Sequence, residues 1–517
     1  MNGAQALIRT LVGCGVDTCF ANPGTSEMHF VAALDDVPEM RAVLGLFEGV
    51  VTGAADGYGR MAPGPAATLL HLGPGLGNGI ANLHNARRAR TPVVSIVGDH
   101  AVGHLPLDPP LASDIESLAR PVSAWFRTSA SPAALPGDAV EAVQGALGPP
   151  GGVATLVLPA DVSWGEGAAP AAAALGRTLR PVGEDLVTAA AKALRSGEPT
   201  VVLVGGDAVR RPGLDAAARV AAATGARLLC ETFPARLERG AGIPAVERLG
   251  YLAEFTMAQL QGARHLVLAG ATAPVSFFAY PGIPGDLVPG GCEVHRLAAP
   301  GDDAAAALDA LAETLGAPPG PPAEALPPAA RPDRPTGGLD AQTMAAAVGA
   351  LLPEGAVVSD EGNTAGIFVS GATAGAPPHD WLCLTGGAIG QGMPLATGAA
   401  VACPGRRVLS LEADGSAMYT LQALWTQARE GLDVTTVILD NGAYAILELE
   451  LGRVGAEPPG PRARRMLSLR PPALDFVALA AGMGVPATRA TTAEEFTDQL
   501  ARSFATPGPA LVHALLG

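Results

Sequence analysis

Two apolar runs, each followed by polar residues and glycine, constrain the fold of this 517-residue chain most strongly. Residues 408–411 and 434–439 have the composition of buried strands, and residues 419–430 between them have the pattern of an amphipathic helix. This order predicts a βαβ unit, in which the two strands are parallel and their carboxyl ends lie side by side. Asp414 and Asn441 should therefore meet at one edge of a sheet, where open α/β sheets bind ligands.

The polar residues at these strand ends suit a metal ion and a diphosphate. Asp414 and Asn441 offer hard oxygen ligands, which Mg²⁺ prefers together with water and substrate phosphates. Gly415 and Ser416 would let backbone amides approach the same phosphates. Asp-Gly and Asn-Gly are also common turn dipeptides, and either alone would favour a simple turn. Their pairing on one βαβ unit favours a ligand site.

This pattern resembles the metal and diphosphate motif of thiamine-diphosphate-dependent enzymes, in which G-D-G-S is followed by N-N-G. The chain reads A-D-G-S at residues 413–416 and D-N-G at residues 440–442. The resemblance implies Asp414, Asn441 and the carbonyl of Ala443 as Mg²⁺ ligands. Ala413 and Asp440 depart from the motif, and the extra carboxylate could either tighten the metal or repel diphosphate.

A second segment resembles the pyrimidine-domain helix of the same family. Residues 44–61 read LGLFEGVVTGAADGYGRM, and Glu48 matches the family's glutamate. In the family this residue bonds the aminopyrimidine of the cofactor and promotes the tautomer that removes the thiazolium C2 proton. A partly exposed glutamate stabilised by the helix dipole is the alternative, but the accompanying motifs favour the catalytic role.

Two loops resemble those of benzoylformate decarboxylase, a member of this family. Residues 21–27 read ANPGTSE, and Thr25 stands where a serine faces substrate. Thr25 or Ser26 could equally cap the helix that follows. Residues 69–79 read LLHLGPGLGNG, and His71 matches a histidine that transfers protons near the reacting carbon. A core histidine with satisfied hydrogen bonds is the alternative.

Two more segments match the cofactor groove of the family. Residues 386–394, GGAIGQGMP, include Gly387 and place Ile389 under the bend between the two cofactor rings. A branched side chain there would preorganise the cofactor, although an ordinary core isoleucine would fit the same pattern. Residues 360–364, DEGNT, match a loop that reaches the diphosphate, so Asn363 and Thr364 are candidate donors.

The order of strand-like and helical segments predicts an α/β protein with three doubly wound parallel-sheet domains. They correspond to the pyrimidine, central and diphosphate domains of the family. We expect the pyrimidine-binding domain at residues 1–165, the central domain at 181–315 and the diphosphate and Mg²⁺ domain at 339–517. Residues 316–338, dense in Pro and Ala, are expected to form a linker, and residues 166–180 a shorter one. The predicted strands are residues 18–21, 67–71, 92–97, 154–158, 200–205, 227–230, 265–269, 292–297, 356–359, 408–411, 434–439 and 510–513.

Composition excludes several classes of protein. The net charge of −16, without a basic stripe, argues against nucleic-acid binding. The long uncharged run at residues 381–405 is interrupted by Gly and Pro, so we expect no membrane helix. The six cysteines show no CxxC and no zinc spacing. Arg9 interrupts the apolar N-terminal stretch, which argues against a signal peptide and favours a cytoplasmic enzyme.

The resemblance implies thiamine-diphosphate- and Mg²⁺-dependent decarboxylation of a small-molecule 2-oxo acid. The resulting enamine would be protonated to an aldehyde or ligated to a second carbonyl, as in acetolactate synthase. Decarboxylation of the benzoylformate type, without carboligation, is the alternative. The flavin signature of acetolactate synthase is not found, so FAD is not predicted. Because the family builds each site from two subunits, we expect at least a homodimer and more specifically a homotetramer.

Departures from benzoylformate decarboxylase leave the substrate open. That enzyme takes a second histidine from its central domain, whereas residues 274–282 read PVSFFAYPG. Phe277 and Phe278 could line an apolar pocket instead. His100 and His104 could supply a proton or lie in a solvated loop.

Two other classes compete with this interpretation. A nicotinamide oxidoreductase is suggested by Gly73, Gly75 and Asn78, which approximate GxGxxG after a strand. The third glycine is displaced, however, and the acidic residue expected at the end of the next strand is not in place, although Asp99 is near. A non-catalytic regulatory subunit is suggested only by the two departures from the metal motif, and Glu48 argues against it.

Overall fold

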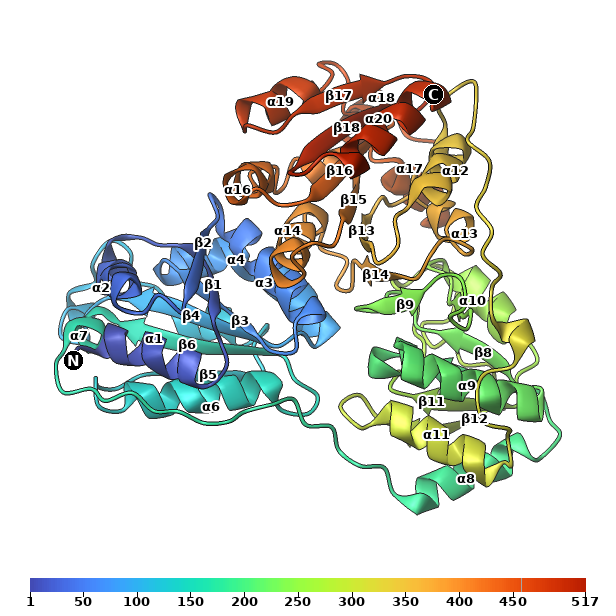
Figure 1. Ribbon diagram of the computed structural model, residues 1–517, viewed down its shortest axis with the longest axis horizontal. Helices are drawn as coiled ribbons and strands as arrows, with labels where there is room; N and C mark the ends of the chain where they lie inside the picture. Colours follow the sequence, from blue (N-terminus) through green and yellow to red (C-terminus); the bar gives the residue numbers. More distant parts are fainter. Residues whose placement is uncertain (457) are drawn as a thin grey trace.

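The computed structural model describes residues 1–456 and 458–517, and within them the chain forms three α/β units, each on its own sheet (Figure 1). In chain order, the units are coloured blue to cyan, green to yellow, and orange to red. The predicted fold class of three parallel-sheet α/β domains is confirmed, with one antiparallel strand added to the third sheet.

The first sheet has six parallel strands in the order β2-β1-β3-β4-β6-β5. Strands β3, β4 and β6 are buried along their whole length, as expected for apolar runs covered by helices on both faces. The order reverses between β1 and β3, and such a switch point is where α/β sheets bind ligands. The elements are α1 (Gly3–Gly13), β1 (Thr18–Asn22), α2 (Met28–Ala33), β2 (Arg41–Leu44), α3 (Glu48–Met61), β3 (Ala66–Leu70), α4 (Leu72–Ala89), β4 (Val93–Asp99), α5 (Ile115–Ala119), β5 (Trp125–Thr128), α6 (Leu135–Leu147), β6 (Val153–Pro159) and α7 (Ala160–Trp164).

The central sheet has five parallel strands in the order β10-β8-β7-β11-β12. Strand β12 lies at one edge of this sheet and pairs with β11. The elements are α8 (Glu184–Leu194), β7 (Thr200–Val204), α9 (Arg211–Thr224), β8 (Arg227–Cys230), β10 (Glu247–Arg248), α10 (Ala253–Leu260), β11 (His265–Ala269), β12 (Glu293–Ala298) and α11 (Ala304–Thr314).

The third sheet has seven strands in the order β17-β18-β16-β15-β13-β14-β9, of which β9 (Leu237–Arg239) comes from the chain before this unit. Its order reverses between β13 and β15, so the carboxyl ends of these two strands form a second switch point. The elements are α12 (Ala341–Leu351), β13 (Val357–Glu361), α13 (Val369–Ala372), β14 (His379–Cys383), α14 (Gly392–Ala402), β15 (Val408–Ala413), α15 (Asp414–Ala417), α16 (Ala423–Glu430), β16 (Val434–Asp440), α17 (Ala445–Arg453), α18 (Pro461–Leu467), α19 (Phe476–Gly482), β17 (Ala487–Ala490), α20 (Ala493–Ala505) and β18 (Ala510–Leu515).

Helices α3 and α14 lie side by side where the first and third units meet (Figure 1). The two backbones approach so closely that a Cβ atom at Gly57 would lie 2.0 Å from the carbonyl oxygen of Leu395. A Cβ atom at Gly398 would lie 1.8 Å from the carbonyl oxygen of Ala54. The small residues that follow Glu48 along α3 are therefore needed for this helix contact.

The structure differs from the sequence predictions at two places. The helix predicted at residues 419–430 begins only at Ala423, because a short helix, α15, already starts at Asp414 and a turn separates the two. Strand β9 (Leu237–Arg239), in the predicted central domain, pairs antiparallel with β14 of the third sheet. The predicted linker at 316–338 packs against both units, since the Ala245 N–H donates to the Ala325 carbonyl and the Ala330 N–H to the Gly375 carbonyl.

In residues 1–456 and 458–517, no helix combines the length and the apolar character needed to cross a membrane.

Candidate active site

Asp414 lies at the switch point of the third sheet and joins two strand ends. It is the first residue of α15, directly after β15, and its side chain is buried. One carboxylate oxygen, Oδ1, accepts a hydrogen bond from the Gly415 N–H at 2.8 Å, and Oδ2 accepts one from the Gly442 N–H at 2.8 Å. The sequence placed Asp414 and Asn441 at neighbouring strand ends, and β15 and β16 are indeed parallel neighbours.

Burial and, to a lesser degree, the neighbouring Asp440 carboxyl raise the pKa of Asp414 to about 6, although the hydrogen bonds from the Gly442 and Gly415 amides lower it. A nearby cation would stabilise the ionised form of the Asp414 carboxyl group.

Asp440, the residue that departs from the motif, has hydrogen-bond partners of its own. Its Oδ1 accepts a hydrogen bond from Nη2 of Arg470 at 2.6 Å, and its Oδ2 is 2.8 Å from Nε2 of His513. Burial raises the pKa of Asp440, but the hydrogen bonds with His513 and Arg470 outweigh this effect, and the pKa falls to about 2. The extra carboxylate is therefore ionised and compensated by Arg470.

Polar groups of two other loops face the same strand ends. Nδ2 of Asn363 donates to Oγ of Ser416 at 3.0 Å, which joins the loop after β13 to α15. Asn363 has a left-handed backbone with φ of +47°, a conformation that asparagine tolerates better than most residues. Oδ1 of Asn441 accepts from the Ala443 N–H at 3.0 Å, and Asn441 is exposed. Thr364 follows Asn363 and is half-buried.

The loop that carries Ile389 is fixed through its backbone on both sides. On one side, Nδ2 of Asn85 donates to the Ala388 carbonyl at 2.8 Å. On the other, the Gly390 N–H donates to Oε1 of Glu361 at 2.7 Å, and the Gly390 carbonyl accepts from Oγ1 of Thr420 at 2.9 Å. Ile389 itself is half-buried between these anchors, and Gly387 is exposed.

Glu361 forms a fully buried carboxyl pair with Glu412 behind this loop. Burial raises the pKa of Glu361 to about 7, although the amides of Gly390 and Gly392 lower it. Burial and the Glu361 charge raise the pKa of Glu412 well above its ordinary value. The pair therefore retains at least one proton near neutral pH.

Glu48 and His71 both lie close to Gly75 at the switch point of the first sheet. A Cβ atom at Gly75 would lie 3.1 Å from Oε1 of Glu48 and 3.4 Å from Cβ of His71. Glu48 is the first residue of α3 and is buried, and its Oε2 accepts a hydrogen bond from Nδ2 of Asn78 at 3.0 Å. The role of Asn78 as a partner of Glu48 was not predicted.

Glu27 is a second residue that the sequence analysis missed. Its Oε2 lies 2.8 Å from Nδ1 of His71 and accepts a 2.7 Å hydrogen bond from the Gly24 N–H. Burial raises the pKa of Glu27, although the hydrogen bonds from Gly24 and His71 lower it. A glutamate three residues after Gly24 has the spacing of a capping box, and this signal could have pointed to it.

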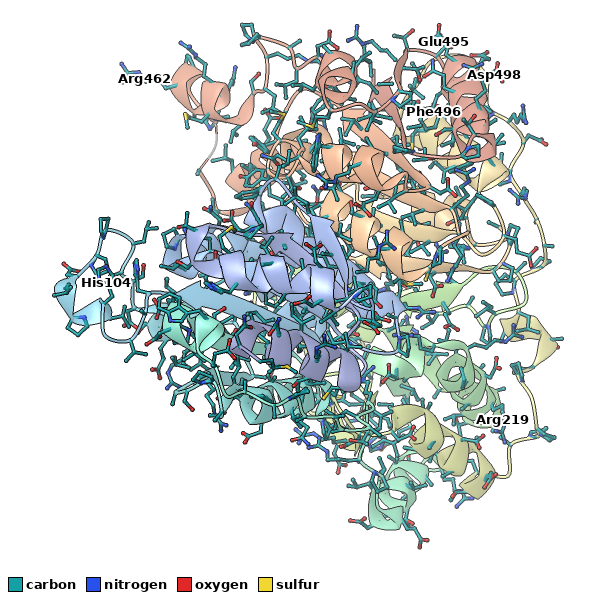
Figure 2. All side chains as sticks on the ribbon, turned by 60° about the vertical axis from the view of Figure 1, so that its left-hand side comes forward. His104, Arg219, Arg462, Glu495, Phe496 and Asp498 are labelled. Carbon is teal, nitrogen blue, oxygen red and sulfur yellow. The ribbon has the colours of Figure 1, made fainter. Side chains whose placement is uncertain are left out.

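Thr25 is exposed beside this pair, at the start of a short 3₁₀ helix (Thr25–Glu27). Neither Thr25 nor Ser26 provides a side-chain cap to the helices that follow, so the capping alternative is not supported. His104 lies on a loop that projects from the first unit (Figure 2), and its ring centroid is 5.8 Å from that of His100.

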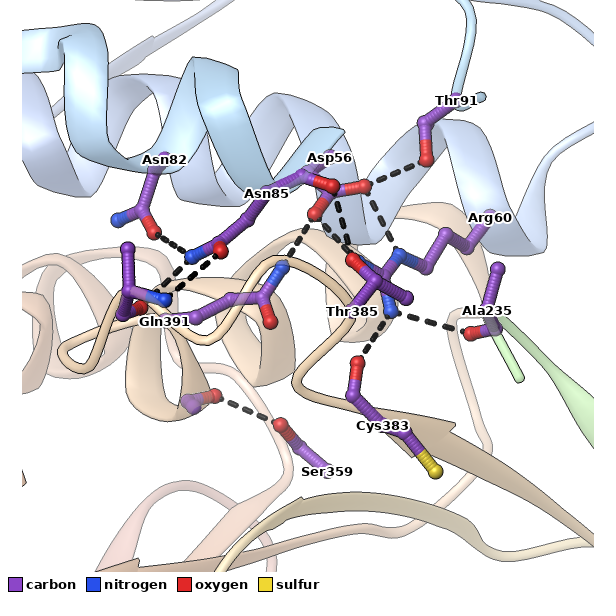
Figure 3. Close-up of polar contacts among 12 residues, drawn as sticks. Asp56, Arg60, Asn82, Asn85, Thr91, Ala235, Ser359, Cys383, Thr385 and Gln391 are labelled. Atoms are coloured by element: carbon purple, nitrogen blue, oxygen red, sulfur yellow. Dashed lines mark hydrogen bonds and ion pairs between the residues drawn. The ribbon is translucent and has the colours of Figure 1, made fainter. Parts of the chain in front are cut away.

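A buried ion pair on α3 ties the helix of Glu48 to the third unit (Figure 3). Arg60 donates to both oxygens of Asp56, at 2.8 and 2.7 Å. Arg60 also donates to the Cys383 carbonyl at 2.7 Å, and Nε2 of Gln391 donates to Asp56 at 2.5 Å. Because Gln391 lies next to the Ile389 loop, this network fixes α3 and that loop relative to each other.

Comparison with known proteins identifies the family. Residues 1–117 match the family described as thiamine pyrophosphate enzyme, N-terminal TPP binding domain, and residues 362–514 match the corresponding C-terminal TPP binding domain. A Mycobacterium tuberculosis protein named "Putative acetolactate synthase large subunit IlvX" is 62% identical over 518 residues, which cover 100% of this chain and 99% of that protein. The chain belongs to the thiamine pyrophosphate enzyme family.

Other relatives of this thiamine pyrophosphate enzyme carry different names. Benzoylformate decarboxylase of Pseudomonas aeruginosa is 30% identical over 531 residues, covering 96% of each chain. The solved structure of a thiamine diphosphate-dependent 4-hydroxybenzoylformate decarboxylase from Rhodococcus jostii RHA1 superimposes with a TM-score of 0.86, covering 100% of this chain and 99% of that one. That structure is 24% identical in sequence, so the likeness is one of fold.

The residues of this thiamine pyrophosphate enzyme fit the cofactor that the family name implies. The third unit supplies a carboxylate, a carboxamide and a backbone carbonyl at Asp414, Asn441 and Ala443, a donor set suited to Mg²⁺. The Tyr444 ring packs directly against Gly415, since a Cβ atom there would lie 2.3 Å from the ring. In contrast, the glycines expected for a nicotinamide fingerprint lie inside α4 and do not form a turn before it.

Proposed function

We propose that this thiamine pyrophosphate enzyme decarboxylates a 2-oxo acid with the aid of Mg²⁺, and either releases the aldehyde or joins it to a second carbonyl compound. The observation that carries the proposal is the link between Asp414 and Gly442, which brings the oxygen ligands and the phosphate-facing loops of two neighbouring strands together. When bound, thiamine diphosphate would supply the electron sink that accepts the electron pair left by carbon dioxide.

The residues of the third unit hold the cofactor in this proposal. Asp414, Asn441 and the Ala443 carbonyl bind Mg²⁺, and the diphosphate lies against Gly415, Ser416, Asn363 and Thr364. Ile389, with Gly387 beside it, supports the bend between the cofactor rings. The hydrogen bonds from Asn85 to Ala388 and from Gly390 to Glu361 keep this support in place.

The residues of the first unit move protons in this proposal. Glu48 bonds the aminopyrimidine through the carboxylate oxygen that Asn78 leaves free. His71 exchanges a proton with the reacting substrate through Nε2, since its Nδ1 faces Glu27. Thr25, exposed next to Gly24, holds the substrate carboxylate.

A second copy of the chain would complete the site, giving at least a homodimer and more specifically a homotetramer. Large apolar side chains are exposed around the proposed cofactor loops, which supports an interface there. Those next to Asn363 are Ile367 and Phe368, at 65% and 42% exposure, and those after Ser416 are Met418 and Tyr419, at 42% and 52%.

An aromatic cluster supports a substrate with an apolar side chain. The ring centroid of Phe277 lies 5.2 Å from that of Tyr251 and 4.9 Å from that of Phe278. Phe277 contacts the cofactor loop, because a Cβ atom at Gly387 would lie 2.6 Å from its Cζ. Phe277 and Phe278 lie in residues 274–282, the stretch that lacks the second histidine of benzoylformate decarboxylase.

The proposal is tested on the purified full-length chain with thiamine diphosphate and Mg²⁺. Carbon dioxide release is measured over a panel of 2-oxo acids that includes pyruvate, branched aliphatic and phenyl-substituted members, with and without an added aldehyde. We expect turnover to be fastest with an apolar substituent. The product, aldehyde or ligated hydroxyketone, is identified by mass. Absence of carbon dioxide release across the panel from protein saturated with cofactor contradicts the proposal.

A further inference from the structure

Three side chains of metal-binding type gather on the central sheet, outside the proposed active site. His265 begins β11, and Glu293 and His295 lie on the edge strand β12. In the parallel register, His265 is opposite Glu293, and Val267 is opposite His295. Because alternate residues of a strand share a face, all three side chains project from the same face of the sheet.

The potential ligand atoms of these side chains form a small triangle. Nδ1 of His265 is 3.0 Å from Nε2 of His295, and Oε2 of Glu293 lies 3.8 Å from the first nitrogen and 3.9 Å from the second. Tetrahedral zinc with bonds of about 2.0–2.1 Å places its ligand atoms roughly 3.4 Å apart. Shifts of less than about 1 Å would therefore convert the triangle into one face of a tetrahedral site.

A carboxylate outside the triangle orients one ligand. Nε2 of His265 is 3.0 Å from Oε2 of Glu198, so this nitrogen can donate its proton to the carboxylate and leave the Nδ1 lone pair facing the triangle. Histidines that bind metals commonly donate their second N–H to a carboxylate in this way. Arg264 is 3.9 Å from the other oxygen of Glu198, so it contacts the orienting carboxylate.

Burial and charge also suit a cation here. The side chains of His265 and His295 are 11% and 15% exposed, whereas Glu293 is 70% exposed and can reorient. Within the described residues, these three form the cluster of His, Cys, Asp or Glu side chains close enough to share one ion.

We propose that His265, Glu293 and His295 bind a divalent transition-metal ion of the Zn²⁺ type, with water in the fourth position. Imidazole nitrogen favours such an ion over Mg²⁺, so this site and the Mg²⁺ site of the third unit select different metals. The ion fastens the edge strand β12 to β11, and its water-bound position faces the side on which Glu293 is exposed.

The test uses the full-length protein, freed of metal by a chelator and then saturated with Mg²⁺ and thiamine diphosphate to fill the proposed active site. Titration with Zn²⁺ is followed by calorimetry, and titration with Co²⁺ by the visible bands of tetrahedral cobalt. We expect one Zn²⁺ per chain in the presence of excess Mg²⁺, and cobalt bands that Zn²⁺ abolishes.

Variants decide whether the three side chains hold the ion. His295→Gln and Glu293→Gln should each weaken Zn²⁺ binding at least 10-fold, and Glu198→Gln should weaken it about 10- to 100-fold through loss of the orienting carboxylate. His29→Gln, which changes an exposed histidine beside Trp164, is the matched control and should bind Zn²⁺ like the wild type. If His295→Gln does not fold, the exposed Glu293→Gln still tests the site.

Two results overturn the proposal. One is wild-type protein that takes up no Zn²⁺ in excess Mg²⁺. The other is Glu293→Gln or His295→Gln protein that retains wild-type Zn²⁺ affinity. Retained thiamine diphosphate binding by the variants shows that they are folded.

Discussion

Oδ2 of Asp414 accepts a 2.8 Å hydrogen bond from the backbone N–H of Gly442. The carboxylate that directly follows β15 is thereby tied to the loop that follows β16, the neighbouring parallel strand. One side chain thus sets the distance between the two loops that would share Mg²⁺, and the loop after β16 carries Asn441 and Ala443.

Asp414→Ala should therefore abolish Mg²⁺-dependent binding of thiamine diphosphate, because it removes both a ligand and the link to Gly442. Calorimetric titration of the cofactor in the presence and absence of Mg²⁺ measures this loss. Asp498→Ala, which removes an exposed carboxylate from α20 (Figure 2), is the control and should bind normally. Wild-type cofactor affinity in Asp414→Ala would exclude this residue as a ligand.

Glu48→Gln should retain cofactor binding but lose turnover by about 10²- to 10⁴-fold, the range that one positioned acid or base contributes. The amide can still accept the hydrogen bond from Asn78, so the local structure should persist. Carbon dioxide release under saturating cofactor is the measurement. An unchanged rate would remove Glu48 from the reaction.

Arg60→Ala should lower the free energy of unfolding by about 3–5 kcal/mol, because it leaves the buried Asp56 carboxylate without its ionic partner. The double variant Asp56→Leu, Arg60→Met should lose much less, since it leaves no buried charge unpaired. Denaturant titration followed by fluorescence compares the two. Equal losses would show that packing, not charge pairing, makes this contact important.

The Glu361 and Glu412 pair should make stability depend on pH. The pKa of Glu361 is about 7 in the folded protein and is raised by burial above the ordinary value of 4.5. The folded state therefore holds a proton that the unfolded state has lost between these two values, and stability falls as pH rises through that window. One proton contributes a slope of about 1.4 kcal/mol per pH unit.

Thermal unfolding of the cofactor-free protein between pH 5 and pH 7.5 measures this slope. Glu412→Gln removes a carboxyl group whose own pKa is raised well above its ordinary value, and with it one group that gains a proton on folding. The slope should become shallower in this variant. A melting temperature that rises with pH over the same interval, in wild type and variant alike, would contradict the assignment.

Local patterns predicted much of this architecture. Apolar runs such as β15 and β16 have enough length and composition to identify strands, and Asp414 and Asn441 follow from their position at the strand ends. Strand β9 was missed because three residues, Leu-Glu-Arg, carry no recognisable period, and only pairing with the distant β14 makes them a strand. The helix predicted at residues 419–430 was too long, because the residues of the turn before Ala423 continue the amphipathic spacing of the helix.

Contacts between distant segments could not be read from the sequence. Asp440 and Arg470 lie on separate segments of the chain, and no local sequence pattern indicates that they pair. The pairing of Glu27 with His71 depends on how β1 and β3 lie beside each other. The structure thus shows that Arg470 compensates the charge of Asp440 and that Glu27 bonds the ring of His71.

Gly98→Ala offers a test of the Glu27 and His71 pair that leaves both side chains chemically intact. A Cβ atom at Gly98 would lie 1.7 Å from Oε1 of Glu27, so the carboxylate must move and its contact with His71 must break. If Glu27 orients His71 for proton transfer, Gly98→Ala should lower kcat with little change in cofactor affinity, and Glu27→Gln should reproduce the effect.

Gly103→Ala is the matched control, because it lies in the loop after the same strand and its Cβ atom would meet nothing within 4 Å. Steady-state kinetics and calorimetry on the three variants separate the possibilities. Loss of kcat in Gly98→Ala and Glu27→Gln, with Gly103→Ala unaffected, supports the positioning role of Glu27. Normal kcat in Glu27→Gln would show that His71, if it transfers protons at all, does so without this carboxylate.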